Sequence, residues 1–123
     1  MKFTDVCIFT ENVIKLAEFY EKIFNVKADK DKIHTVLELD DLSITFYDRK
    51  HAESLMKFDF SESGHGMNYI GFNVDNVDDE YIRLKKLGIL NMSEPTLWPW
   101  GAKSFNLSDI EGNRIMFRSY SEE

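Results

Sequence analysis

The sequence predicts an α+β fold in which two βαβββ repeats form a curved mixed sheet around a cleft. Three observations lead to this prediction. Apolar and polar residues alternate with strand-like period in both halves of the chain, each half has one helix with a single apolar stripe, and the segment Glu11-Asn12-Val13 recurs as Asp75-Asn76-Val77. A helix with one apolar stripe should cover one face of its own sheet. The opposite sheet faces must then meet each other or enclose a ligand.

The first repeat is predicted at about residues 1–48. Asn12 is a typical helix N-cap, and the apolar residues after it recur every three or four positions. The helix should end near Asn25, which tolerates the left-handed conformation of a C-terminal stop. Residues 26–32 are polar and fit either a short edge strand or a loop. The expected strands are residues 3–10, 33–39 and 42–48.

The second repeat is predicted at about residues 67–119. Its helix should begin after Asn76 and end at Gly88, with acidic residues in its first turn and basic residues in its last, as the helix dipole favours. The repeat closes with a ribbon of two alternating strands. The turn between them contains Gly112 and Asn113, which tolerate the positive φ that a tight hairpin requires.

The 123 residues are expected to form a single domain made of both repeats, joined by a linker at residues 49–66 with a helical turn near residues 53–58. No apolar run is long enough to span a membrane, and the N-terminus lacks the apolar segment of a signal peptide. A net charge of −7 argues against a nucleic acid partner. The single cysteine, Cys7, excludes an internal disulfide and suits a reducing cytoplasm.

Several segments together resemble a known family. They are the helices TENVIKLAEFYEKIF and NVDDEYIRLKKLGI, the ending WPWG…SDIEGNRIMF and the order βαβββ found twice. Over essentially its whole length the chain resembles the vicinal oxygen chelate superfamily, which includes glyoxalase I, extradiol dioxygenases, fosfomycin-modifying enzymes and bleomycin-resistance proteins. The family's usual turn is Asp-Pro-Asp-Gly-Asn, whereas residues 109–113 are Asp-Ile-Glu-Gly-Asn. The resemblance implies a homodimer in which each cleft is shared between two subunits. It does not fix the activity, because function depends on the site.

The enzymes of this family hold a divalent metal on the inner sheet face. The resemblance matches their ligand positions to Asp5, Thr45, Tyr69 and Met116, where His, Gln or Glu is usual. Threonine, neutral tyrosine and a thioether are poor ligands for such ions, and Asp5 alone cannot supply the three or more ligands required. The three histidines follow no metal-binding spacing. We therefore expect no metal, no other cofactor and no catalytic residue.

The uncovered sheet faces predict a small-molecule cleft with mostly apolar and aromatic walls and a few polar groups. Trp98 and Trp100 flank Pro99 at its rim, and such rings can stack on flat or cationic groups. Besides the tryptophans, strand alternation places in this cleft Phe3, Asp5, Cys7, Phe9, Ser43, Thr45, Tyr47, Tyr69, Asn73, Met116 and Arg118. The same residues could instead pack against each other or against a second subunit.

Three functions are open at this point. The first is a metal-independent binding protein of the bleomycin-resistance type that sequesters a small aromatic or cationic molecule. The second is a lyase or dioxygenase with a degenerate or relocated metal site, and the third is a non-catalytic interaction domain. The changed metal positions and the two tryptophans favour the first.

Overall fold

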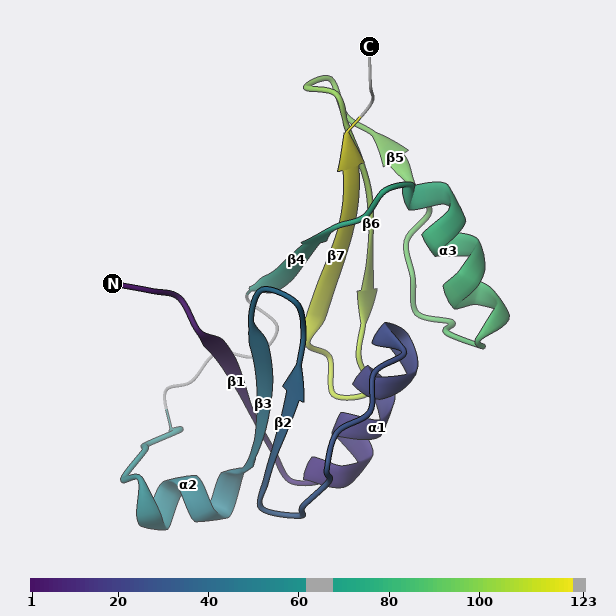
Figure 1. The fold of residues 1–123 in the computed structure, drawn as a ribbon. Coiled ribbons are helices and arrows are strands. Elements are labelled where there is room, and N and C mark those ends of the chain that lie inside the picture. Colours follow the sequence, from purple (N-terminus) through teal and green to yellow (C-terminus); the bar gives the residue numbers. More distant parts are fainter. Residues whose placement is uncertain (62–67, 121–123) are drawn as a thin grey trace. The chain divides into compact units, whose positions relative to one another are not determined.

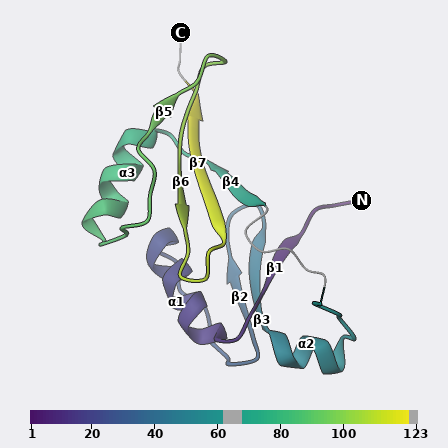
Figure 2. The ribbon, with the colours of Figure 1, turned by 180° about the vertical axis from the view of Figure 1, so that it is seen from behind.

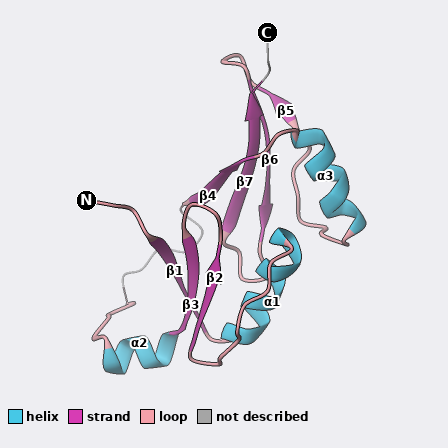
Figure 3. Cartoon of the chain, viewed as in Figure 1, coloured by secondary structure: helices cyan, strands magenta, loops and turns pink. Residues whose placement is uncertain are grey.

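The computed structural model describes residues 1–61 and 68–120, and the chain divides into two compact units, residues 1–63 and 64–123. Helices and strands occur together in each unit (Figure 1 and Figure 3), which confirms the predicted α+β class. The first unit contains β1 (Asp5–Thr10), α1 (Val13–Phe24), β2 (His34–Glu38), β3 (Ser43–Asp48) and α2 (Arg49–Leu55). The second contains β4 (Tyr69–Asn73), α3 (Val77–Lys86), β5 (Thr96–Leu97), β6 (Ala102–Ser108) and β7 (Arg114–Tyr120).

The first unit is a sheet in the order β1-β3-β2 with α1 on one face. β1 runs parallel to β3, and β2 runs antiparallel to it. The side chain of Asn12 accepts a hydrogen bond from the Lys15 N–H at 3.1 Å, and Asn25 adopts φ 54°, so both predicted helix ends are confirmed. The apolar stripe of α1 is buried, and the ring of Tyr20 lies 5.0 Å from that of Phe46 on β3.

The second unit is a sheet in the order β4-β7-β6-β5, which can be followed in Figure 2. β4 runs parallel to β7, while β6 is antiparallel to both β7 and β5. The Asn76 side chain caps α3 by accepting from the Asp79 N–H at 3.0 Å. On the face toward α3, the Phe105 ring meets Tyr81 edge-on at 5.4 Å. Side chains at alternate positions of β6 and β7 therefore point to the other face.

Within residues 1–61, the first repeat lacks the edge strand that β5 forms in the second repeat. Residues 26–32 form a loop rather than an edge strand, so in the described part of the chain the first sheet has three strands and the second has four. The reason lies in Glu21, whose buried carboxylate accepts from the Ala28 N–H at 2.8 Å and from the Lys30 ammonium at 2.9 Å. These bonds hold the polar segment against the end of α1 instead of along β2.

The predicted linker begins with a helix. The helical turn expected near residues 53–58 lies earlier, as α2, because the Asp48 side chain accepts from the His51 N–H at 3.1 Å and so caps a helix directly after β3. Residues 62–66 of the linker lie outside the described part of the chain. The prediction that both repeats form one domain stays a prediction.

The closing turn is held by Asp109. Its Oδ1 accepts from the N–H groups of Glu111 and Asn113 at 2.8 and 2.9 Å, and Gly112 has φ 88°. Asn113 does not adopt positive φ; its side-chain amide donates to Asp109 at 2.8 Å instead. Among the described residues, no helix has the length and apolar character needed to cross a membrane.

Candidate functional site

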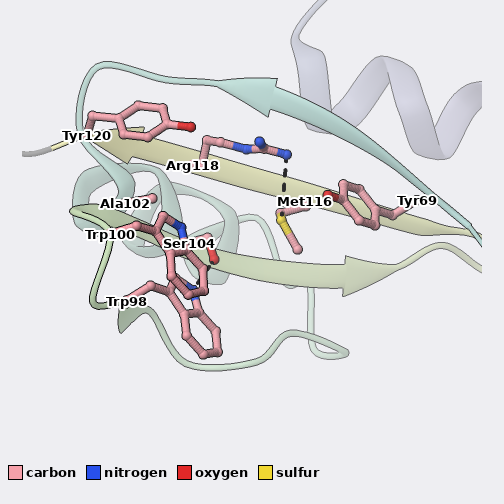
Figure 4. A pocket seen from close by; sticks show the side chains of 8 residues that line it. All are labelled: Tyr69, Trp98, Trp100, Ala102, Ser104, Met116, Arg118 and Tyr120. Atoms are coloured by element: carbon pink, nitrogen blue, oxygen red, sulfur yellow. Dashed lines mark hydrogen bonds between the residues drawn. The ribbon is translucent and has the colours of Figure 1, made fainter.

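The second sheet carries a pocket of about 240 Å³ on the face opposite α3. Figure 4 shows the side chains around it, which come from β4, β6, β7 and the turn before β6. They are Tyr69, Trp98, Trp100, Ala102, Ser104, Met116, Arg118 and Tyr120. The strand period explains the set, since the lining positions on β6 and on β7 are two residues apart. The register pairs Ser104 with Arg118 and Ala102 with Tyr120, which brings both rows to one place.

The two tryptophans form one wall of this pocket. They belong to a turn that is closed by hydrogen bonds from the Gly101 N–H to the Trp98 carbonyl at 3.0 Å and from the Trp98 N–H to the Ala102 carbonyl at 2.8 Å. Pro99 stands second in this turn, where its fixed φ fits. The two rings stack with centroids 5.4 Å apart and planes at 5°, and the Trp98 Nε1–H donates to the Ser104 hydroxyl at 2.8 Å.

Exposure separates a pocket wall from a packed core. Trp98 is 40% exposed and Trp100 is 70% exposed, whereas the core rings Phe105 and Phe117 on the other face are 1% and 2% exposed. The tryptophans are therefore held by the turn, by each other and by Ser104, and one large aromatic surface remains open to solvent.

Arg118 supplies the charge of the pocket. Its Nη2–H points to the Met116 sulfur at 3.8 Å, a weak acceptor, and its buried Nε–H has no hydrogen-bond partner among the described residues. Hydrogen bonding to Tyr120 raises the pKa of Arg118 against the lowering effect of burial, and Tyr69 adds to the rise. The guanidinium is thus a fixed positive charge whose donors are only partly satisfied.

Gly71 makes room for this guanidinium. A Cβ at Gly71 would lie 2.6 Å from Arg118 Nη2 and 3.3 Å from Tyr69 Cε1, closer than non-bonded atoms normally approach. The register places Gly71 opposite Met116, on the strand that neighbours β7. The missing side chain on β4 is therefore part of what sets the position of Arg118.

The structure brings together five of the predicted ligand-binding residues: Tyr69, Trp98, Trp100, Met116 and Arg118. Asn73 shares their sheet face and pairs in register with Arg118, but it does not line the pocket. Sequence reasoning missed Ala102, Ser104 and Tyr120. Alternation alone could have found them, because they continue the rows of Asn106 on β6 and of Arg118 on β7.

Phe3 and Ser43, which alternation also placed in the cleft, belong to the first unit. So do the five remaining predicted ligand contacts, which are Asp5, Cys7, Phe9, Thr45 and Tyr47. They lie on the sheet face away from α1, where the register pairs Cys7 with Thr45 and Phe9 with Tyr47. Their role as ligand contacts stays a prediction. Desolvation and then the Asp5 carboxylate raise the pKa of the Cys7 thiol, which lowers its thiolate fraction at neutral pH and argues against a nucleophile.

Part of this face is covered by the chain's own rings. Phe9 contacts Phe58 at 5.1 Å and Phe60 at 4.9 Å between ring centroids, and the guanidinium carbon of Arg49 lies 5.3 Å from the Phe60 centroid. The segment after α2, which the sequence suggested was linker, thus packs against the end of β1. Periodicity gave no sign of this packing, because the segment contains no regular repeat.

The positions that the resemblance matches to metal ligands do not fit a metal. In the second unit these are Tyr69 and Met116, and the Met116 sulfur already accepts from the Arg118 guanidinium. In the first unit they are Asp5 and Thr45, one carboxylate and one hydroxyl. Within residues 1–61 and 68–120, no group of three or more His, Cys, Asp or Glu side chains could hold a metal ion.

Comparisons with known proteins agree with this fold. The model of the Glyoxalase/Bleomycin resistance protein/Dioxygenase superfamily matches residues 2–117. A glyoxalase/bleomycin resistance protein/dioxygenase from Nocardioides has TM-score 0.84 and 19% identity, covering 99% of this chain and 85% of its own. Lactoylglutathione lyase from Agrobacterium tumefaciens has TM-score 0.75 and 16% identity, and the match covers 95% of this chain and 92% of the lyase. A bleomycin resistance determinant encoded on the transposon Tn5 has TM-score 0.70 and 18% identity, and the match covers 99% of this chain and 100% of the determinant. At these identities the structural likeness concerns the fold alone. No curated protein sequence matches the chain significantly.

Proposed function

Since the chain belongs to the Glyoxalase/Bleomycin resistance protein/Dioxygenase superfamily, we propose that it is a metal-independent protein that sequesters a small aromatic compound in the pocket of its second unit. The observation that carries this proposal is the stacked, largely exposed pair Trp98 and Trp100 on the wall of that pocket. An open aromatic face beside a few polar groups is what a small planar ligand requires.

The charge of the pocket supports metal independence. Arg118 lies beside Met116, one of the positions matched to a metal ligand. A divalent cation about 4 Å from a guanidinium is repelled by roughly 8 kcal/mol, twice the value for unit charges at an effective dielectric constant of about 20. A thioether and a neutral phenol offer little to offset this repulsion. Solved structures with this fold include a lyase and a resistance determinant. Of these two possibilities, the side chains of Arg118, Met116 and Tyr69 favour binding over metal-assisted catalysis.

We also propose a homodimer in the cytoplasm. Among the described strands of their own units, β1 and β4 each have one edge without a partner, and such edges commonly pair across subunits. Trp100, which is 70% exposed, gives the second unit apolar surface that a second subunit could cover. The single thiol, Cys7, suits a reducing compartment.

The proposal is tested by titration with fluorescence detection. Both tryptophans of the chain line the pocket, so their emission reports on this site. The protein is dialysed against a chelator and screened with aromatic acids, quinones and glycopeptide antibiotics. For a compound that binds, Trp98→Ala, Trp100→Ala or Tyr69→Ala should weaken the affinity measured by calorimetry by about 5–150-fold, which corresponds to ~1–3 kcal/mol.

Leu97→Ala is the matched control. Leu97 is an exposed apolar residue of β5, next to Trp98, but it pairs with Lys103 and so lies on the sheet face away from the pocket. Its affinity should equal that of the unchanged protein. Binding that appears only after a divalent metal is added would support the lyase or dioxygenase alternative. A protein whose emission responds to no compound in the panel would instead be an interaction domain.

A further inference from the structure

We propose that the ligand of this pocket is a planar aromatic carboxylate, bound through its carboxylate by Arg118 and through its ring by the tryptophan pair. This inference rests on the proposed function and names the chemical class of its ligand. It departs from the cationic ligand that the sequence analysis left open, because the charge of the pocket lining is positive although the net charge of the chain is −7.

Among residues 1–61 and 68–120, Arg118 has no anionic partner. None of the ion pairs between described residues involves it, and the eight lining residues include one cation and no acid. Its acceptors are the Met116 thioether and the side chains of Tyr120 and Tyr69. Partly buried charges in proteins are normally paired, so the pocket is electrostatically complete only when an anion enters.

A carboxylate is the anion that best fits Arg118. A guanidinium presents its N–H groups as a planar fork that matches the two oxygens of a carboxylate. The buried Nε–H of Arg118 is one such donor, and it has no partner among the described residues. A phosphate dianion would need a second cation, and the lining supplies only one. One positive charge therefore matches a monoanion.

The aromatic part of the ligand would lie against the aromatic residues around Arg118. Figure 4 shows the tryptophan pair on one side of Arg118 and Tyr69 on the other, with Ser104 next to the tryptophans. A ring attached to a carboxylate at Arg118 would reach these aromatic faces, where stacking is favourable. The volume of about 240 Å³ lies below the ~300–1,000 Å³ of sites for drug-sized ligands. The ligand should thus contain one or two rings.

The test compares three probes that share one ring system and differ in charge: 2-naphthoate, 2-naphthamide and 2-naphthylmethylammonium. Their affinities are measured by isothermal titration calorimetry at pH 7 on the full chain. We expect 2-naphthoate to bind at least about tenfold more tightly than the amide, which corresponds to about 1.4 kcal/mol, and the ammonium compound to bind most weakly.

Two variants assign the preference to Arg118. Arg118→Met should reduce the preference for 2-naphthoate over the amide to about threefold or less, since an uncharged side chain cannot distinguish the two by charge. Gly71→Ala should do the same without changing the guanidinium itself, because its methyl group would displace Nη2. The matched control is Arg114→Met, which removes the same charge from an exposed position of β7 outside the pocket and should leave the preference unchanged.

The outcomes separate this inference from the proposed function. If the amide or the ammonium probe binds as tightly as the carboxylate, and Trp98→Ala weakens that binding, the pocket binds aromatic molecules but the carboxylate assignment is wrong. The same holds if Arg114→Met abolishes the preference as fully as Arg118→Met. If no probe of any charge binds and none changes the tryptophan emission, both the inference and the proposed function fail.

Discussion

The substitution Gly71→Ala should separate ligand binding from stability. Its methyl group would lie 2.6 Å from Arg118 Nη2, so the guanidinium must move by roughly 1 Å to reach an ordinary contact distance of ~3.5 Å. Gly71 does not have positive φ, so the backbone accepts alanine. The displaced group is the end of a flexible side chain, and an off-rotamer arginine costs ~0.5–1.5 kcal/mol.

The stabilisation expected from replacing glycine by alanine is of similar size to this cost. Replacing glycine by alanine in a compatible conformation stabilises a protein by ~0.4–1 kcal/mol, because the unfolded chain loses freedom. The net change in the free energy of unfolding should therefore stay within about 1 kcal/mol, or about 5 °C in melting temperature for a chain of this size. Binding should suffer far more: a lost hydrogen bond to a charged group is worth ~1.5–3 kcal/mol, or about 10–150-fold in affinity for 2-naphthoate.

The assay is a double-mutant cycle. Calorimetric titrations of the unchanged protein, Gly71→Ala, Arg118→Met and the double variant give four affinities for 2-naphthoate, and scanning calorimetry gives the four stabilities. If the methyl group acts through the guanidinium, Gly71→Ala should have almost no effect on affinity when Arg118 is absent. An equal loss in both backgrounds would refute the reasoning, as would a loss of several kcal/mol in stability.

Three further predictions concern the whole chain. After dialysis the protein should carry no stoichiometric Zn, Ni, Mn or Fe, whereas elemental analysis that gives about one metal per chain, lost in Asp5→Ala, would contradict the proposed function. Light scattering should give a mass of twice 14.5 kDa, and a monomer at tens of micromolar would remove the homodimer. Burial acts to raise the pKa of Glu21, but the Ala28 N–H and Lys30 lower it overall. Its contribution to stability should therefore be complete above about pH 4.3, the unfolded value, and should be lost as pH falls through the lower folded pKa. Acid titrations of stability should be less steep in that window for Glu21→Gln than for the unchanged protein.

The sequence predicted helix ends correctly where a single residue caps or ends the helix by itself. Asn12, Asn76 and Gly88 mark helix ends through hydrogen bonds or backbone conformation that depend on few neighbours, and the structure confirms each. Strand alternation likewise found the buried face of both sheets. Asp48 shows the limit of this reasoning: it ends β3 and also caps α2, so a residue counted as strand hid the start of a helix.

The site was harder to predict because its geometry depends on pairing between distant strands. Alternation places Arg118 on the pocket face, but the room for its guanidinium depends on Gly71, which lies on β4 and meets β7 only through the parallel register. No sequence feature within a few residues of Arg118 predicts the room beside Gly71. Phe58 and Phe60 pose the same difficulty in the first unit, since their partner Phe9 is far away in the chain.

The position of Arg118 connects the fold to the proposed chemistry. In the enzymes of the vicinal oxygen chelate superfamily, the inner sheet face holds a divalent cation. In this chain the matched residue Met116 is a poor ligand for such ions, and the guanidinium two residues further along β7 reaches back to its sulfur at 3.8 Å. A positive charge is thus retained on the same sheet face, but it is carried by a side chain that cannot act as a Lewis acid or be exchanged. A guanidinium can still orient an oxygen anion through charge and directional N–H groups. This geometry is the basis for proposing that the face binds an oxyanion through Arg118.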